Sequence, residues 1–359
     1  MQLSDWGWDP FFENQLTDEE RSSTTPARVV WEGRGAYRVA SATGEWLAEL
    51  TGRLRHTVTS RADLPAVGDW VVASTRRSDA RATIQRLLAR RTRFSRRGAG
   101  RPSDEQLVAA NVDTVLLVTS LNRDFNLRRL ERYLALAWES GATPVIVLNK
   151  ADVCEEPEAW RSEAASSAIG VPVLITSAIR GDGLSELAAL VRAGGTTALL
   201  GSSGVGKSSL INAILGESRQ RVGEIRADDD RGRHQTTSRQ LFAVQGGGVL
   251  LDTPGMRELQ LWDAGGGLDH AFADIEALAE ECRFRDCSHA TEPGCAVTEA
   301  AAGGALDEGR LESYRKLRRE EAFLRSQQDE RARAERTRLA KQGSRAIRNL
   351  YKLKGKKGG

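Results

Sequence analysis

The chain has 359 residues, 40% of them hydrophobic and 28% charged, with a formal net charge of +3. That length exceeds what one ordinary core supports, so we expect two or three domains. The sequence has no secretory signal and no apolar run long enough to cross a bilayer, and four cysteines are too few for a disulfide scaffold. These features argue against a membrane or disulfide-stapled protein, and we expect a cytoplasmic protein without a membrane partner.

The N-terminal residues 1–27 are expected to form an extension. It carries four large aromatic residues, which we expect to pack against the body of the protein rather than on a neighbouring surface: Trp6, Trp8, Phe11 and Phe12.

Residues 28–95 are expected to form a barrel of about five short strands. Alternating apolar runs punctuated by Gly, Asp and Pro occur at 28–41, 45–55, 68–75 and 81–89. An oligonucleotide-binding (OB) type barrel is the natural candidate because ten arginines and one acidic residue lie between positions 76 and 101. Small barrels also bind proteins, so the shape alone leaves the ligand open.

A linker is expected at 94–108, and the pattern then becomes α/β. A helix is expected at 127–140, where Asn126 can cap its start and Gly141 can end it. Apolar strands are expected at 112–121, 144–149, 171–176, 196–200, 240–244 and 248–252. This order predicts a doubly wound sheet over 96–265, with ligand loops at the carboxyl ends of its strands.

A phosphate-binding loop is predicted where strand 196–200 is followed by GSSGVGKSS and a helical pattern. Its glycines allow successive backbone N–H groups to face phosphate oxygens, and the helix N-terminus adds partial positive charge. Lys207 is expected to reach the β- and γ-phosphates, and the Ser208 hydroxyl to ligate Mg²⁺. The predicted nucleotide-binding stretch comprises Gly201, Ser202, Ser203, Gly204, Val205, Gly206, Lys207, Ser208 and Ser209.

Two further motifs predict that the base is guanine. Asp152 of the N-K-A-D motif can accept from N1–H and the 2-amino group of guanine, which adenine does not offer in that arrangement. Asn149 can bond the other edge of the base and tie its loop to the phosphate loop, while the Lys150 stem covers a ring face. After the next strand, a backbone N–H is expected to meet the O6 acceptor. These base-binding residues are Asn149, Lys150, Ala151, Asp152, Ser177 and Ala178.

A fourth motif, D-T-P-G at 252–255, follows strand 248–252. Asp252 suits a carboxylate that holds Mg²⁺ through water, and the Gly255 N–H suits the γ-phosphate. Four motifs, each at the end of an apolar strand, indicate a GTPase that uses GTP/GDP and Mg²⁺. In Ras-like GTPases the phosphate loop comes first, whereas here both base motifs precede it. The chain is therefore predicted to be circularly permuted, and nucleotide state is expected to reach the C-terminal region.

The C-terminal residues 266–359 are expected to form a zinc-binding and basic helical domain. Three thiolates and one imidazole within fourteen residues make a closed tetrahedral set for one structural Zn²⁺: Cys282, Cys287, His289 and Cys295. Residues 306–342 have a helical pattern with a packing stripe at Leu311, Tyr314, Leu317 and Leu324. Residues 341–359, with seven basic and no acidic residues, suit either rRNA phosphates or a solvated tail.

The permuted motif order, the N-terminal barrel and the cysteine cluster together resemble the ribosome small-subunit-dependent GTPase A family (RsgA), over about residues 28–300. The resemblance implies hydrolysis of GTP to GDP and phosphate, stimulated by the small (30S) ribosomal subunit late in its maturation. We expect the protein to be a monomer in solution that contacts rRNA. Two alternatives remain: an RNA-binding assembly scaffold or checkpoint factor with GTP as an affinity switch, and a permuted GTPase of another RNA particle.

Residues 226–241 are expected to form a mobile switch. Thr236 is expected to complete the Mg²⁺ shell, because of its distance from the strand at Leu241, with Thr237 as the next candidate. The resembled family usually has Thr where Gln235 stands, which leaves the register of this segment open. Met256 occupies the place of the water-positioning glutamine of Ras-like enzymes and cannot orient water, which predicts low intrinsic activity. His234 resembles the histidine of the family's GRH-T-T segment and is the candidate for that role, although it also fits a surface loop. The predicted catalytic set is His234, Thr236 and Lys207.

Overall fold

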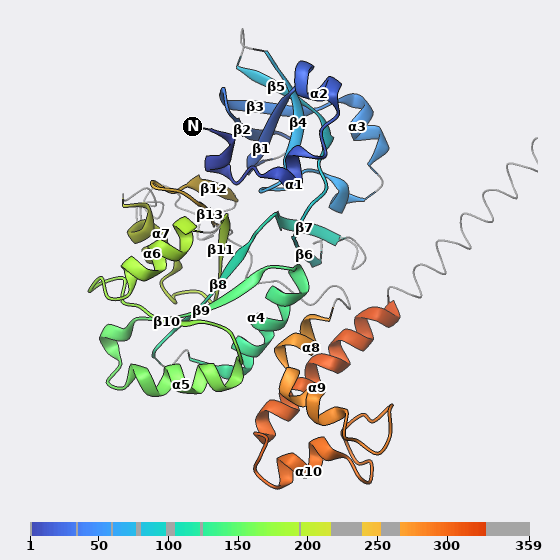
Figure 1. Ribbon diagram of the computed structural model, residues 1–359, viewed down its shortest axis with the longest axis vertical. Coiled ribbons are helices and arrows are strands. Elements are labelled where there is room, and N and C mark those ends of the chain that lie inside the picture. Colours follow the sequence, from blue (N-terminus) through green and yellow to red (C-terminus); the bar gives the residue numbers. More distant parts are fainter. Residues whose placement is uncertain are drawn as a thin grey trace, which may run out of the picture.

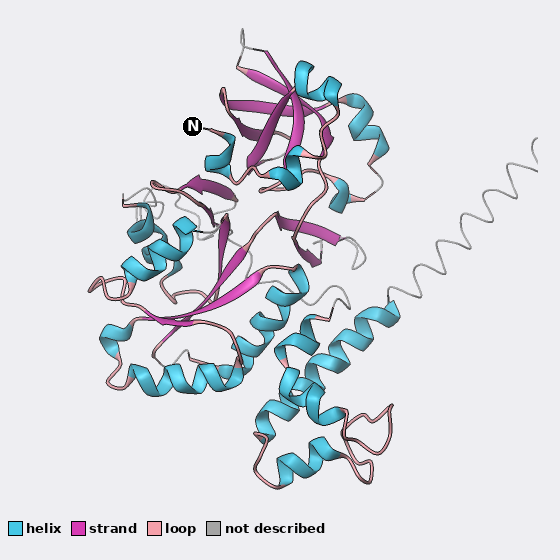
Figure 2. Cartoon of the chain, in the orientation of Figure 1, coloured by secondary structure: helices cyan, strands magenta, loops and turns pink. Residues whose placement is uncertain are grey.

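The computed structural model shows an N-terminal barrel, a central α/β unit and a C-terminal group of helices (Figure 1). It describes residues 2–33, 35–58, 60–76, 80–97, 105–122, 125–193, 195–216, 239–252 and 266–327. Within these ranges, eleven strands pair into one continuous sheet in the order β10-β9-β8-β11-β13-β12-β1-β2-β3-β5-β4. One end of this sheet closes into the barrel, and the other end is the open sheet of the α/β unit (Figure 2).

The barrel contains five strands, as predicted, in the order β1-β2-β3-β5-β4, and β4 returns to pair with β1. The β3–β5 pairing is parallel and the others are antiparallel. The strands are β1 (Thr25–Glu32), β2 (Tyr37–Ser41), β3 (Gly44–Leu50), β4 (Trp70–Arg76) and β5 (Arg81–Leu87). Fully buried side chains fill the barrel: Val29, Val39, Ala48, Val71 and Ile84.

The strand predicted over 45–55 is wrong in its second half. Strand β3 ends at Leu50, and helix α3 (Gly52–Thr57) follows. The Thr51 hydroxyl accepts a hydrogen bond from the Leu54 N–H at 3.2 Å, so it caps this helix. The cap satisfies one of the free N–H groups at the helix start and diverts the chain from the sheet.

The N-terminal extension packs against the body of the protein, as predicted. It contains η1 (Leu3–Trp6), α1 (Pro10–Glu13) and α2 (Asp18–Ser23). Trp6 and Phe12 are 4% and 2% exposed, and the Trp8 and Trp70 rings meet edge to face with their centroids 4.7 Å apart.

The linker predicted at 94–108 is instead a pair of strands. Strand β6 (Arg93–Arg97) pairs antiparallel with β7 (Glu105–Ala110). Phe94 and Val108 are buried in the same core cluster as the aromatic residues of the extension. Burial of these apolar side chains therefore offsets the conformational entropy that is lost when the two strands become ordered.

The α/β unit is doubly wound, as predicted. Leu116 and Val118 pack with α6 and α7 on one face, whereas Val115 and Leu117 lie in the cluster that contains α4 and α5 on the other. Strand β12 is antiparallel to β13, and the other strands of the unit are parallel. The elements are β8 (Thr114–Ser120), α4 (Leu127–Ser140), β9 (Thr143–Asn149), α5 (Pro157–Ser167), β10 (Val173–Ile175), α6 (Leu184–Ala193), β11 (Thr196–Leu200), α7 (Lys207–Leu215), β12 (Gln240–Ala243) and β13 (Val249–Asp252).

The C-terminal part is helical, with α8 (Gly267–Ala271), α9 (Ala273–Ala279), α10 (Ala296–Ala302) and a long helix over 308–327. The predicted packing stripe of this last helix is confirmed, because its four members are 2–8% exposed: Leu311, Tyr314, Leu317 and Leu324. Among the helices of the described ranges, none combines the length and apolar character needed to cross a bilayer.

Candidate nucleotide and zinc sites

The predicted nucleotide motifs meet at the carboxyl edge of the parallel strands. Strand pairing sets Leu200 beside Leu117 and Asn149 beside Ser120, so the segments after β11 and β9 leave the sheet at the same edge. Strand β10 pairs with β9, and β13, which ends at Asp252, pairs with β11. The spatial order of the strands in the sheet therefore brings the base motifs and the phosphate loop together, although these motifs follow a permuted order along the sequence.

The loop between β11 and α7 is tightly curled, and two of its glycines are required by close contacts. A Cβ at Gly201 would lie 2.2 Å from the Val118 carbonyl oxygen, and one at Gly206, whose φ is +98°, would lie 2.3 Å from Asn149 Nδ2. The Lys207 Nζ donates to the carbonyl oxygens of Gly201 and Ser202, each at 2.7 Å. The ammonium is thereby held within the loop at the start of α7. Ser203, Gly204, Ser208 and Ser209 are exposed.

The buried side chain of Asn149 joins three of these loops. Its Nδ2 donates to the Val205 carbonyl of the phosphate loop at 2.8 Å. Its Oδ1 accepts from Thr176 Oγ1 at 3.2 Å and from the Ala178 N–H at 3.4 Å, in the segment after β10. Asn149 is 1% exposed, so these bonds are sheltered from water. The base loops and the phosphate loop are therefore held at a fixed spacing.

Asp152 lies in the short helix η3 (Ala151–Val153), which follows Lys150 in the left-handed conformation with φ of 64°. The Ser177 hydroxyl donates to Asp152 Oδ1 at 2.6 Å. This hydrogen bond, helped by the charges of Arg180 and Lys150, outweighs desolvation and holds the pKa of Asp152 below its usual 3.8. The side chain is thus an ionised acceptor, as recognition of two guanine donors requires.

Arg180 also contacts this loop and was not predicted from the sequence. Its Nη2 donates to the Asp152 backbone carbonyl at 3.1 Å. No motif signals this contact, because an arginine within a Gly- and Asp-containing turn is an ordinary surface residue.

Several predicted site residues lie outside the described ranges. They are His234, Gln235, Thr236, Thr237, Gly255 and Met256, and their roles stay predictions. The same applies to most of the switch predicted at 226–241, and to the basic end of the chain from residue 328 onward.

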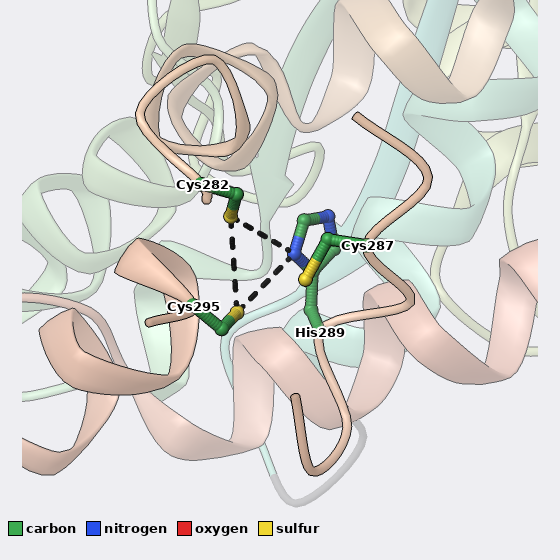
Figure 3. A group of neighbouring side chains, drawn as sticks. All are labelled: Cys282, Cys287, His289 and Cys295. Atoms are coloured by element: carbon green, nitrogen blue, oxygen red, sulfur yellow. Dashed lines mark hydrogen bonds between the residues drawn. The ribbon is translucent and has the colours of Figure 1, made fainter. Parts of the chain in front are cut away.

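The four predicted zinc ligands converge, with their ligand atoms all within 4.8 Å of one another (Figure 3). His289 Nδ1 is 3.6 Å from the Cys282 sulfur and 3.5 Å from that of Cys295, and these two sulfurs are 3.8 Å apart. A tetrahedral zinc ion with bonds of about 2.3 Å to sulfur and about 2.0 Å to nitrogen sets its ligand atoms about 3.5–3.8 Å apart. The cluster therefore fits Zn²⁺, with His289 binding through Nδ1.

The start of α10 favours the thiolate form of one ligand. Cys295 is the N-cap of this helix, and the Thr298 N–H donates to its sulfur at 3.5 Å. Burial raises the pKa of the Cys295 thiol, but the hydrogen bonds from Thr298 and His289 outweigh it, and the pKa falls below its usual 9.0. A thiolate is the form that binds zinc.

The fold and the motif order together define a circularly permuted P-loop GTPase. Comparison with solved structures agrees. The crystal structure of YjeQ from Thermotoga maritima is similar with a TM-score of 0.63 and 28% identity, over 83% of this chain and 99% of that chain. YloQ, described as a circularly permuted GTPase, shares the fold with a TM-score of 0.60 at 23% identity, over 87% of this chain and 99% of that chain.

Sequence comparisons identify the family. The RsgA GTPase family model matches residues 87–262. A protein of Opitutus terrae named small ribosomal subunit biogenesis GTPase RsgA is 48% identical, over 96% of this chain and 98% of its own length. A protein of the same name in Streptomyces coelicolor is 46% identical, over 98% of this chain and 93% of its own length. The chain belongs to the RsgA GTPase family.

Proposed function

We propose that this GTPase acts on the small (30S) ribosomal subunit late in its maturation, in the cytoplasm, and that the subunit stimulates its hydrolysis of GTP to GDP and phosphate. The observation that carries the proposal is the Asn149 side chain, which joins both base loops to the phosphate loop. The ribosomal partner is supported by the near full-length relatives that are named small ribosomal subunit biogenesis GTPases.

Guanine is selected by groups at the outer rim of the site. Asp152 accepts from N1–H and the 2-amino group, and a backbone N–H of the segment after β10 donates to O6. The Lys150 stem covers one face of the ring. The ionised state of Asp152 and its hydrogen bond from Ser177 support this assignment.

The phosphates and Mg²⁺ are bound on the inner side of the site. Backbone N–H groups of residues 201–209 and the Lys207 ammonium bind the β- and γ-phosphates. Ser208 and Thr236 would ligate Mg²⁺, with Asp252 holding it through water, and the ion would neutralise charge on the phosphates. The Gly255 N–H donates to the γ-phosphate. The exposed Ser208 hydroxyl at the start of α7 supports this arrangement.

His234 positions the attacking water, because Met256 cannot. We expect His234→Ala to reduce subunit-stimulated hydrolysis about 100-fold while leaving GTP binding intact. The measurement is single-turnover hydrolysis with purified small subunits. A variant with the wild-type stimulated rate would remove His234 from the mechanism.

We assign four segments to the proposed function: the extension (1–27), the barrel (28–95), the permuted GTPase domain (96–265) and the zinc-binding and basic helical domain (266–359). The protein acts as a monomer, and its two outer domains contact rRNA. For the C-terminal domain, this contact is supported by a groove of about 950 Å³ between the zinc loop (residues 282–295) and helix 308–327. Five of its lining residues are arginines, of which Arg318 and Arg325 are paired with carboxylates. The other three, Arg285, Arg315 and Arg319, suit phosphate.

The deciding experiment measures the GTPase rate of the purified full chain with and without purified small subunits. We expect a low intrinsic rate and strong stimulation by small, but not large, subunits. No stimulation would contradict the proposal. A hydrolysis-dead variant that binds GTP then separates a cycling enzyme from a scaffold, because a trapped complex with the subunit supports the enzyme and normal maturation supports the scaffold.

A further inference from the structure

We propose that Arg180 is a positioning residue for guanine selection, which acts by holding the main chain of the turn that carries Asp152. This inference rests on the proposed function, because it takes Asp152 as the residue that binds guanine. It adds a residue outside all four nucleotide motifs.

Arg180 contacts the Asp152 turn in two ways. Its Nη2 donates to the Asp152 carbonyl oxygen at 3.1 Å, and its backbone N–H donates to Ser177 Oγ at 3.1 Å. That hydroxyl donates in turn to Asp152 Oδ1 at 2.6 Å. The direct contact is made by the side chain and fixes the main chain of Asp152. The relayed contact is made by the backbone N–H, so every Arg180 variant keeps it, and substitution tests the direct contact alone. A carboxylate must be fixed at both places to stay in the plane of a base.

The segment that carries Arg180 is itself firmly attached to the sheet. The Ser177 N–H donates to the Asp182 carbonyl at 3.0 Å, and the Gly181 N–H donates to the Ser177 carbonyl at 2.8 Å. Gly183 has a φ of +67°, and a Cβ there would lie 2.1 Å from the Ile175 carbonyl oxygen of β10. The Asp152 turn, by contrast, is a three-residue helix at the rim. The segment 177–183 is therefore held by its own hydrogen bonds and by β10, and it holds the Asp152 turn in place.

The charge of Arg180 acts in the same direction. The Ser177 hydrogen bond is the main cause that lowers the pKa of Asp152, and the charges of Arg180 and Lys150 add to it. Because Arg180 is exposed, its contribution is modest and we expect effects of several-fold rather than orders of magnitude.

The position of the Asp152 carboxylate can be tested by comparing nucleotides whose bases offer it two donors or one. The guanine base offers N1–H and a 2-amino group to one carboxylate, whereas hypoxanthine, the base of ITP, offers N1–H alone. A displaced Asp152 carboxylate keeps one hydrogen bond more easily than two. Loss of Arg180 should therefore weaken GTP more than ITP, while a general loss of structure would weaken both equally.

The experiment compares Arg180→Ala with Arg180→Lys, which keeps a donor and the charge, and with Arg192→Ala as a matched control. Arg192 is also exposed and donates to a backbone carbonyl, that of Gln245 at 3.1 Å, at the opposite edge of the sheet. Steady-state hydrolysis of GTP and ITP by the full chain, with small subunits present, gives KM and kcat for each variant.

For Arg180→Ala we expect the KM for GTP to rise about 5-fold with kcat unchanged, and the preference for GTP over ITP to fall about 3-fold. Arg180→Lys should recover part of both effects, and Arg192→Ala should match the wild type. A wild-type GTP-to-ITP ratio in Arg180→Ala, or equal losses for both nucleotides, would overturn the inference alone. A wild-type protein that does not prefer GTP over ITP would instead contradict the guanine assignment.

Discussion

The Asn149 amide shows how one buried side chain can set the spacing of a binding site. Its nitrogen is used by the phosphate loop and its oxygen by the segment after β10. Gly206 must be glycine because this nitrogen occupies the space a Cβ would need. Two motifs that are more than fifty residues apart in the sequence are therefore fitted to each other at atomic distance.

Exchange of Asp152 for Asn is predicted to change the base that the site accepts. The amide can present a donor toward the 2-position, which suits the 2-oxo group of xanthine and opposes the 2-amino group of guanine. We expect Asp152→Asn to lose about 2–3 kcal/mol of GTP affinity, or about 30- to 150-fold, and to gain affinity for XTP. Titration with fluorescent GDP and XDP analogues checks this, and an unchanged GTP affinity would refute the guanine assignment.

Glu20 is predicted to stabilise the chain in a pH-dependent manner. The Arg86 guanidinium bonds both of its oxygens, at 2.9 and 2.8 Å, and mainly through these bonds the pKa of Glu20 falls from 4.5 to about 2. A lowered folded-state pKa means that the stabilisation is complete above pH 4.5 and is lost as the pH falls toward 2. We expect Glu20→Gln to cost about 1 kcal/mol at pH 7, since Arg86 is partly exposed.

Thermal unfolding of Glu20→Gln and wild type between pH 7 and pH 2 checks this prediction. The difference in Tm should shrink as the pH falls. Glu19→Gln is the matched control, because Glu19 is an exposed neighbour on the same helix. A difference that is constant with pH would show that the Arg86 pair does not contribute.

The zinc loop is an element that depends on its metal. Between α9 and α10 the chain has no strand or long helix, and its four ligands come from residues 282–295. His289 adopts a positive φ of 56°, which is unfavourable for a non-glycine residue. Its carbonyl accepts a hydrogen bond from Arg315 on helix 308–327. A zinc ion bound by these residues would therefore stabilise the contact between the loop and this helix.

Removal of zinc is predicted to unfold this part of the chain selectively. We expect one zinc ion per chain in gently purified protein, and a loss of several kcal/mol of local stability on chelation or in Cys295→Ser. Metal analysis and limited proteolysis of residues 282–327 measure both effects. GDP binding should be retained, because the base and phosphate loops lie in the α/β unit. A metal-free protein with unchanged protease resistance would contradict the prediction.

At the scale of the whole molecule, helix 308–327 is fastened to the α/β unit through Arg310. Its guanidinium is 6% exposed and bonds Asp274 at 2.6 Å and Glu131 of α4 at 3.2 Å. Burial raises the pKa of Glu131 although Arg128 and Arg310 oppose this effect, because its side chain is fully buried. Removal of Arg310 would take this partner from Asp274 and would leave Glu131 paired with Arg128 alone. The C-terminal helices should therefore move together with α4.

Arg310→Leu is predicted to destabilise this attachment by about 3–5 kcal/mol, the usual cost of breaking a buried ion pair. The matched control is Arg132→Leu, which removes the two-bond pair with Glu320 on the same helix. The two side chains of that pair are about one quarter exposed, so loss of the pair should lower the free energy of unfolding by at most about 1 kcal/mol. Urea unfolding of the full chain measures both. Equal effects of the two variants would show that burial of Arg310 is unimportant.

Much of this architecture was predictable, because strands buried on both faces and glycine-rich loops leave strong local patterns. The sheet, the five-stranded barrel and the zinc cluster were predicted from such patterns. The β6–β7 pair was missed because the pattern of β6 is dominated by arginines, although β7 contains four apolar residues. Arg180, Arg310 and the turn to α3 after Leu50 were also missed, since they depend on single side chains that meet partners distant in the sequence or cap a short helix.

Strand β1 belongs both to the closed barrel and to the open sheet, because Trp31 pairs with Gln240 of β12 and Arg239 bonds Glu32 and the Leu107 carbonyl. Within the described residues, β12 pairs with both β1 and β13, and β13 ends at Asp252. A force on the barrel would therefore be transmitted along hydrogen-bonded strands toward the predicted phosphate-binding side of the sheet. If a particle bound at the barrel changes the affinity for the nucleotide, the nucleotide must change the affinity for that particle by the same free energy.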